Sequence, residues 1–203
     1  MLIFASNVSS CTSLLRDMGV DFCTIDANVC QSVSKNERPI DYVKRLSLEK
    51  AQQVRDAHPR TPILSAETIV SVGTRILHKA ENDDSAFQHM RLLSGRRHRV
   101  YTCVTLILPV EPFKMIQRLC TVHVAFKVLT TQEIMHFVAS SEWRRAHVYD
   151  YAGYARRFVR WMRGLPTTLE GLPFFETYQL LKGNGFIQED IDVLKSIPRL
   201  NVH

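Results

Sequence analysis

Two strand-length segments in the middle of the chain, Arg99–Leu108 and Cys120–Leu129, constrain its fold more than any other feature. Every second residue of the later segment is apolar, which is the period of a β-strand with one buried face; these residues are Cys120, Val122, Val124, Phe126 and Val128. Segments with helical spacing lie both before and after the two strands. This order of mixed strands and helices predicts an α/β fold with antiparallel strand pairs added.

The other elements follow from short apolar runs and from helical periodicity. Further strands are expected at Leu2–Ala5, Phe22–Ile25, Ile63–Val70, Arg75–Leu77 and Arg157–Arg163, the third and fourth joined as a hairpin by Gly73-Thr74. Helices are expected from a capping Ser9 to Gly19, from Pro39 through Val43, Leu46 and Val54, from Asp84 or Ser85 to Gly95, from a Thr130 to Glu133 capping box through Phe137, and from Pro173 to Gly183. The polar stretch Asp26–Arg38 is expected to be a surface loop.

Composition indicates a globular chain, and its net charge indicates an anionic partner. Its 203 residues are 45% hydrophobic and 23% charged, which predicts one domain over residues 1–203. The formal net charge of +6 predicts an anionic partner. No apolar run is long enough for a membrane span, and the apolar N-terminus lacks the basic residues of a signal peptide, so we expect a buried first strand. Five cysteines without C-x-x-C spacing favour a reducing cytoplasm.

Three charged residues occupy positions where apolar residues are expected. Lys50 continues the stripe of Val43, Leu46 and Val54, so it points at the sheet, although its stem could pack there while the ammonium reaches solvent. Glu67 interrupts an apolar strand; it either meets a metal, a lysine or water inside a cleft, or lies on the solvated face of an edge strand. Lys79 ends the hairpin, where a surface lysine is the ordinary case. Their combination suggests a site.

Arginines gather in two places, Arg96–Arg99 and the stretch from Glu142 to Arg163, which holds six arginines against two acids. They suggest phosphate binding or else a solvated rim. Interleaved aromatic residues either stack on bases or belong to the core; they are Trp143, Tyr149, Tyr151, Tyr154 and Trp161. Dinucleotide, P-loop, zincin and hydrolase signatures are absent, and the eight histidines lack the spacing of zinc ligands.

In order along the chain, four segments resemble the Maf family of nucleoside triphosphate pyrophosphatases, from Leu2 to about Gly185. They are Leu2-Ile3-Phe4-Ala5-Ser6, then Tyr42–Leu46 with Glu49-Lys50-Ala51, then Ser94–Thr102, and finally Gly171-Leu172-Pro173. The resemblance implies a Maf/ITPase-like fold, with an elongated mixed twisted sheet flanked by helices and two lobes around a central cleft. It also implies metal-assisted cleavage of a nucleoside triphosphate, including a non-standard one, to the monophosphate and pyrophosphate.

The resemblance also implies roles for particular residues. Glu67 stands at the family's catalytic aspartate, as general base or metal ligand, and the metal would be Mg²⁺ or Mn²⁺. Lys50 and Lys79 match lysines that clamp the triphosphate, Ser6 matches the first serine of a phosphate loop, and Arg145 is an auxiliary phosphate contact. The implied partner is a nucleotide rather than a nucleic acid or a membrane, and assembly of two copies stays open.

The match departs from the family pattern at several positions. Ser10 and Cys11 replace the arginine pair of the phosphate loop, Cys30-Gln31 replaces an acidic pair, and a glutamine is missing from Tyr149–Gly153. Glu67 is one methylene longer than aspartate, and a displacement of about 1 Å can cost about a hundredfold in rate. The alternative hypothesis is therefore a Maf-like protein that has lost catalysis, still binds nucleotide and is connected to cell-division control.

Overall fold

The computed structural model describes residues 1–110, 112, 114–144 and 148–187, whose strands form one seven-stranded sheet. The strands are β1 (Leu2–Phe4), β2 (Phe22–Thr24), β3 (Ile63–Val72), β4 (Arg75–Leu77), β5 (Arg97–Leu108), β6 (Lys114–Phe126) and β7 (Val159–Arg163). Their order is β2-β1-β3-β5-β6-β7, and β4 pairs with β3. The strand β1 is parallel to β2 and β3, and all other pairs are antiparallel. The predicted mixed sheet is confirmed.

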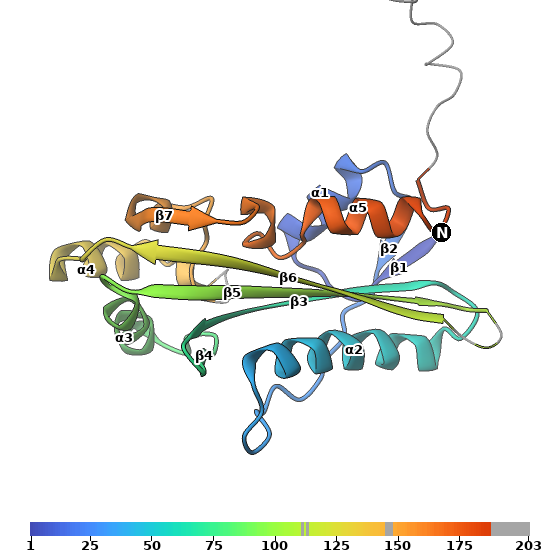
Figure 1. Ribbon diagram of the computed structural model, residues 1–203, viewed down its shortest axis with the longest axis horizontal. Coiled ribbons are helices and arrows are strands. Elements are labelled where there is room, and N and C mark those ends of the chain that lie inside the picture. Colours follow the sequence, from blue (N-terminus) through green and yellow to red (C-terminus); the bar gives the residue numbers. More distant parts are fainter. Residues whose placement is uncertain (111, 113, 145–147, 188–203) are drawn as a thin grey trace, which may run out of the picture.

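The two long strands determine the shape of the molecule. Twelve residues of β5 pair with β6 in one continuous register from Arg97 to Leu108, which spans about 40 Å at 3.4 Å per residue. Figure 1 shows the sheet running along the whole length of the molecule as a consequence. The elongated, twisted sheet expected from the family resemblance is present.

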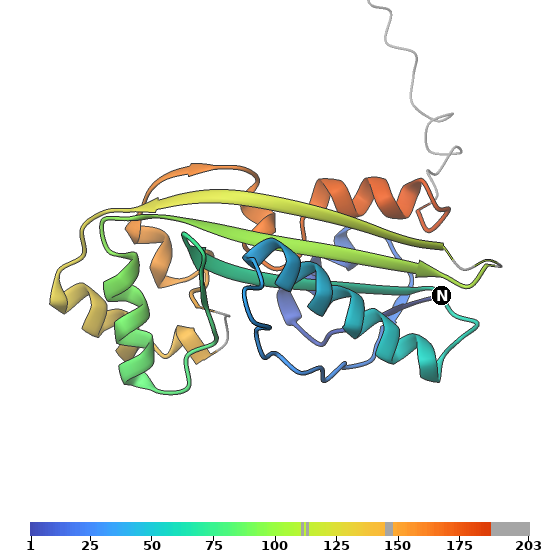
Figure 2. The ribbon, with the colours of Figure 1, turned by 60° about the horizontal axis from the view of Figure 1, so that its bottom comes forward.

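Helices cover different parts of the two sheet faces. They are α1 (Ser9–Asp17), α2 (Pro39–Ala57), α3 (Asp83–Leu93), α4 (Thr131–Ala139) and α5 (Phe174–Lys182). The helix α2 packs on one face through two clusters of buried apolar residues. At one end of the other face lie α1 and α5, and at its far end lie α3 and α4. Figures 1 and 2 show these groups at opposite ends of the sheet, which form the two lobes.

Several predicted local signals are confirmed. Pro39 is the first residue of α2, where its missing N–H costs nothing, and Val43, Leu46 and Val54 of its stripe are buried. Thr130 and Glu133 form the capping box at the start of α4.

Other local predictions are wrong. Val8 rather than Ser9 occupies the N-cap of α1, without a side-chain hydrogen bond, and the cap of α3 is Asn82. Val128 does not share the buried face of β6, because the strand ends at Phe126 and Val128 is 79% exposed. Among the described residues, no helix is both long and apolar enough to cross a membrane.

Candidate active site

The sheet is interrupted along one edge of β3. Residues Ile63 and Leu64 of β3 pair with β1, and residues 70–72 pair with β4, so the stretch between them has a neighbour only on the β5 side. Within the described part of the chain, no strand covers this edge from Ser65 to Ile69.

Along this part of β3, the backbone N–H and C=O groups of successive residues point alternately into the gap and towards β5. The Leu64 carbonyl accepts from the amide of Ala5 on the open side of β3, and backbone groups two residues apart point the same way. Those of Ala66 and Thr68 therefore point into the gap, while those of Glu67 point at Cys103 of β5. The gap thus presents backbone donors and acceptors to whatever enters it.

A cavity of about 440 Å³ fills this gap between the two lobes. Its walls come from the segment after β1, from α2, β3 and β5, and from the chain after β4 and before α5. They are lined by Ser6, Val8, Ser9, Ser10, Cys11, Gln31, Lys50, Ala66, Glu67, Thr68, Val70, Lys79, Val100, Val148, Tyr149, Asp150, Ala152, Leu169, Glu170 and Gly171. Segments far apart in sequence meet here, as expected for the central cleft.

Lys50 and Glu67 form a buried ion pair at this cavity. Lys50 Nζ lies 2.5 Å from Glu67 Oε2, and the two side chains are only 16% and 8% exposed. Glu67 Oε2 has no hydrogen bond among the described residues, so the ammonium is the main compensation for its charge. The ammonium does not reach out to bulk solvent, and the carboxylate is not on a solvated strand face. Both of those alternatives are wrong.

The structure brings Ser6 and Lys79 to the same cavity. Ser6 is buried just after β1, and its Oγ accepts a hydrogen bond from the amide of Val8. Lys79 follows β4 and is exposed to solvent while lining the cavity. Arg145 lies outside the described residues. None of the arginines that the structure describes lines the cavity, so of the two clusters only Arg145 stays a predicted phosphate contact there.

Two further carboxylates face the cavity, Asp150 and Glu170. Burial and the nearby Asp150 raise the pKa of Glu170 above its ordinary value. The backbone carbonyl of Glu170 accepts from Ser10 Oγ at 2.7 Å and from Cys11 Sγ at 3.7 Å. Burial raises the pKa of the Cys11 thiol to about 12, so this cysteine is not a thiolate nucleophile.

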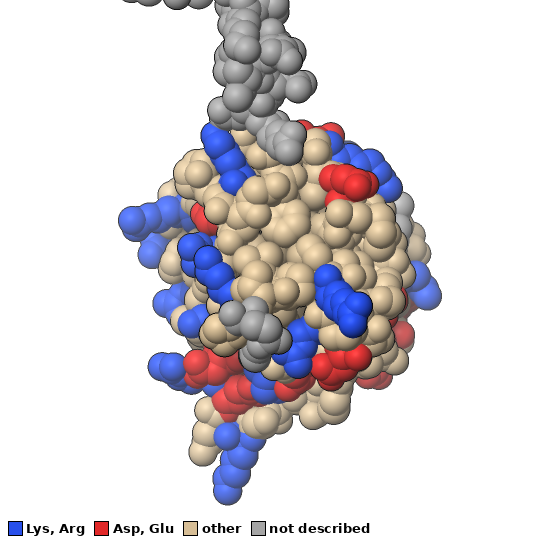
Figure 3. Space-filling model, turned by 90° about the vertical axis from the view of Figure 1, so that its right-hand side faces the viewer, with Lys and Arg blue, Asp and Glu red and all other residues tan. Residues whose placement is uncertain are grey.

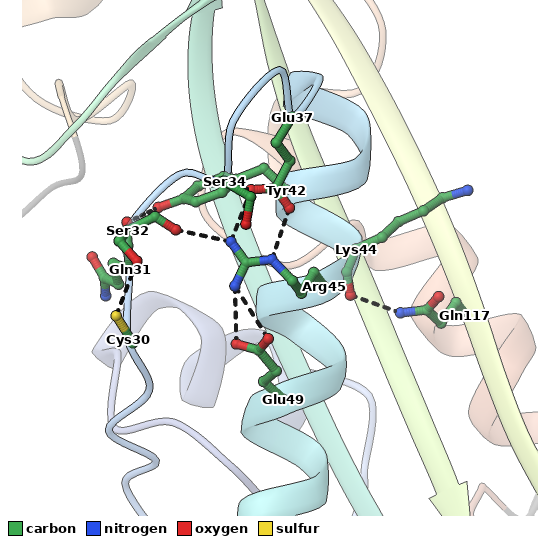
Figure 4. A network of polar contacts seen from close by, with 10 residues as sticks. All are labelled: Cys30, Gln31, Ser32, Ser34, Glu37, Tyr42, Lys44, Arg45, Glu49 and Gln117. Atoms are coloured by element: carbon green, nitrogen blue, oxygen red, sulfur yellow. Dashed lines mark hydrogen bonds and ion pairs between the residues drawn. The ribbon is translucent and has the colours of Figure 1, made fainter.

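A polar network attaches the loop from Asp26 to Arg38 to α2, and this loop carries Gln31 to the cavity (Figure 4). Arg45 donates to both oxygens of Glu37, at 2.7 and 2.9 Å, and also to Glu49 and the Ser32 carbonyl. The hydrogen bond from Arg45 holds the pKa of Glu37 below its ordinary value. Tyr42 donates to the carbonyl of Gln31 at 2.6 Å. The position of Gln31 therefore depends on α2.

On the opposite wall, Tyr149 is held by a buried histidine. Its hydroxyl lies 2.8 Å from Nε2 of His98, and both side chains are at most 6% exposed. Burial lowers the pKa of His98 to about 4 and raises that of Tyr149. Tyr149 and Trp143 thus belong to the core, whereas Trp161 is 46% exposed.

Gln31, Asp150 and Glu170 are cavity residues that sequence reasoning did not select. All three lie in segments without helix or strand periodicity, and only the tertiary fold brings them to β3. Periodicity could not have found them. The family resemblance marks the position of Gln31 and the segment that contains Asp150, but it gave neither residue a role in the site.

The family model described as Maf-like protein matches residues 1–184. The chain is 38% identical over 187 residues to the dTTP/UTP pyrophosphatase of Zymomonas mobilis, covering 91% of this chain and 92% of that protein. It is 40% identical over 182 residues to the dTTP/UTP pyrophosphatase of Wolbachia pipientis subsp. Culex pipiens, covering 89% and 92%. The dTTP/UTP pyrophosphatase of Rhodopseudomonas palustris is 40% identical over 193 residues, with 91% and 92% covered.

Solved structures are more distant. The nucleoside-triphosphatase / dITP/XTP pyrophosphatase of Mycobacterium abscessus gives a TM-score of 0.43 at 14% identity, covering 62% of this chain and 73% of that chain. A HAM1 protein of Coxiella burnetii gives 0.42 at 13% identity, covering 90% and 98%.

Proposed function

The chain belongs to the Maf family of nucleoside triphosphate pyrophosphatases, and on that premise we propose that it cleaves dTTP and UTP to the monophosphate and pyrophosphate. The observation that carries this proposal is the meeting of Glu67, Lys50 and Lys79 at one cavity between the lobes. Relatives with 38 to 40% identity over about nine tenths of the chain support the choice of pyrimidine substrates.

In the proposed reaction, Glu67 accepts a proton from the water that attacks phosphorus, which is the role of a general base. Lys50 orients this carboxylate through their ion pair and adds positive charge beside the phosphates. Lys79 contacts the triphosphate from the end of the gap beside β4, and Ser6 contacts it from the end beside β1. Arg145, outside the described residues, remains the proposed auxiliary contact.

A divalent cation, Mg²⁺ or Mn²⁺, is part of the proposal. The described residues contain no cluster of three or more His, Cys, Asp or Glu side chains able to hold a metal by themselves. Mg²⁺, however, is usually held by one or two carboxylates together with substrate phosphates and water. Glu67 fits that role, since its carboxylate lines the cavity and Lys50 is its only ion-pair partner among the described residues. When bound, the cation would offset phosphate charge and polarise the phosphoryl group.

The charge balance of the cavity makes the cation important. Two lysines face three carboxylates, Glu67, Asp150 and Glu170, so the described lining has one formal negative charge more than positive. A triphosphate entering this cavity is repelled unless other cations accompany it. We therefore expect binding and turnover to depend steeply on the divalent cation.

The test is pyrophosphate release from a panel of ribo- and deoxyribonucleoside triphosphates with Mg²⁺ and with Mn²⁺. We expect dTTP and UTP to be the best substrates. Glu67→Gln should reduce kcat by about a hundredfold or more, the usual contribution of a general base. Glu81→Gln, an exposed acid after β4, is the matched control.

Turnover equal in the protein and in Glu67→Gln would disprove the catalytic role of Glu67. Nucleotide binding by calorimetry without any pyrophosphate release would instead support the alternative of a binding protein that has lost catalysis. Ser10 and Cys11, which line the cavity in place of the family's arginine pair, are the observation behind that alternative.

A further inference from the structure

The proposed reaction gives a role to only one arginine of the two clusters, Arg145. Arg97 and Arg99 on β5 and Arg163 on β7 come from the two arginine-rich segments of the sequence, and none of them lines the cavity. Their place in the sheet follows from strand register.

Register puts these arginines on one face of the sheet. Arg99, His123 and Arg163 lie directly side by side across β5, β6 and β7. Two residues further along, Arg97, Ala125 and Trp161 form the next row. Because residues in register and residues two apart share a face, both rows point the same way. We call Arg97, Arg99, His123, Trp161 and Arg163 the arginine face.

No helix in the described part of the chain covers the arginine face. Farther along β5 the same face continues with Tyr101 and Cys103, which are buried under α2. The opposite face carries Val100 and Val122, which pack in the core with α3 and α4. Figures 1 and 2 show no helix crossing in front of the halves of β5 and β6 beside β7.

The side chains of this face are open to solvent. All three of its arginines are exposed, and Trp161 is 46% exposed. The Arg97 guanidinium lies 5.8 Å from the centre of the Trp161 ring, within the range of a cation–π contact.

Positive charge on this face is not neutralised within the described chain. Arg38 and Arg45 on α2 form ion pairs with carboxylates, whereas Arg97, Arg99 and Arg163 have no carboxylate partner among the described residues. Figure 3, which views the other end of the molecule, shows acidic and basic side chains interspersed. A concentration of one charge sign attracts a polyanion and repels a second copy of the same face.

We propose that the arginine face binds single-stranded nucleic acid. Arginine contacts backbone phosphates and also stacks on bases, and an exposed tryptophan provides the stacking platform that single strands use. An acidic peptide would use the arginines but not the ring. A lipid surface favours apolar side chains that project beyond the charged ones, and Trp161 instead lies among arginines of the neighbouring rows of the sheet.

The test is fluorescence anisotropy of labelled oligo-dT and oligo-U with the full chain, at salt concentrations from about 50 to 200 mM. Three arginine-phosphate contacts predict a salt slope of about −2, so affinity should fall about 20-fold over this range. Arg97→Gln/Arg99→Gln/Arg163→Gln should remove most of this slope. Trp161→Ala should weaken binding about fivefold or more while leaving the slope unchanged.

The matched control is Lys35→Gln/Arg60→Gln/Lys114→Gln, which changes net charge equally at exposed positions; Lys114 pairs with Leu108 at the other end of β5 and β6. It should keep most of the affinity. Equal loss in both triple variants, or a slope near zero, would overturn the proposal. Tighter binding of poly-glutamate peptide or phosphatidylserine vesicles than of the oligonucleotides would also overturn it. Excess thymidine monophosphate should not displace the oligonucleotides, because the cavity is a separate site.

Discussion

The ion pair of Lys50 and Glu67 places two largely buried charges at the wall of the cavity. Each charge is tolerated because the other lies 2.5 Å away. Removing one partner of such a pair leaves an uncompensated buried charge. Replacing both residues by apolar ones instead substitutes apolar packing for the ion pair.

We therefore expect Lys50→Met to lower the free energy of unfolding by about 3 kcal/mol. Lys50→Met/Glu67→Leu should recover most of that loss. Urea unfolding followed by circular dichroism measures both. A double variant that is less stable than Lys50→Met would contradict this expectation, because it would mean that the ion pair contributes net stability to the fold.

His98 predicts a pH dependence of stability. Its pKa is about 4 in the fold, against an ordinary value of 6.5, because burial disfavours the charged ring. The unfolded chain therefore binds a proton between these values that the folded chain does not, so stability falls as pH drops from 6.5 towards 4. The difference corresponds to about 3 kcal/mol. Unfolding free energies at pH 7 and pH 5 should differ less in His98→Gln than in the parent chain; an identical difference would contradict this account.

Among site residues, those on regular elements could be predicted. Lys50 was visible because it continues a helical stripe, and Glu67 because it interrupts an apolar strand. Asp150 and Glu170 were not visible, since loop residues have no periodicity that reveals where they point. Their proximity to Glu67 is a property of the tertiary fold.

At the scale of elements, α2 connects the loop from Asp26 to Arg38 with the cavity. Arg45 binds two carboxylates and a loop carbonyl at once, so it holds the loop more firmly than a single exposed ion pair would. This explains how a segment without regular structure places Gln31 reproducibly.

Arg45→Gln should raise KM for the nucleotide about fivefold while changing kcat little, because it loosens a wall of the cavity without touching the carboxylate that acts on water. Steady-state kinetics of pyrophosphate release gives both constants. Arg38→Gln, which breaks the exposed pair with Asp41 on the same helix, is the control and should behave like the parent chain. A lower kcat at unchanged KM would contradict this role.

Element boundaries show where sequence patterns stop being informative. The capping box at Thr130 was predictable because both of its residues are local. The end of β6 was not, since the amide of Lys127 donates to the carbonyl of Phe158, a partner more than thirty residues away. Val128 lies beyond this contact and is exposed to solvent.

For the whole molecule, the main feature is a cavity between two apolar cores. Val70 and Val100 on its wall belong to the core with α3 and α4, and Cys11 and Ala66 belong to the core with α1 and α5. A ligand that contacts both walls stabilises both lobes.

Binding of dTTP with Mg²⁺ to the Glu67→Gln variant should therefore raise its melting temperature. At about a hundred times Kd the stabilisation is about 2.7 kcal/mol, or about 5 to 10 °C for a chain of this size. Thermal unfolding with dTTP, UTP and ATP tests this. A shift that is equal for all three would contradict pyrimidine selectivity.

Strand order was beyond the reach of the sequence. The hairpins β3–β4 and β5–β6 follow from neighbouring segments, but the insertion of β3 between β1 and β5 depends on long-range pairing. The interruption beside β3, which makes the cavity, follows from how far β1 and β4 extend along the same edge.

This interruption should be visible in hydrogen–deuterium exchange. The amides of Ala66 and Thr68 face the cavity, while those of Ser65, Glu67 and Ile69 face β5. Exchange along one strand should thus alternate between fast and slow from residue to residue, and nucleotide should slow only the fast set. Amide spectra by NMR resolve single residues, and uniform exchange along this stretch would refute the alternation. The residue that carries the proposed catalytic carboxylate, Glu67, is then held by backbone pairing with β5 that opens only when the sheet opens. The amides of its two neighbours, Ala66 and Thr68, exchange with solvent without that opening.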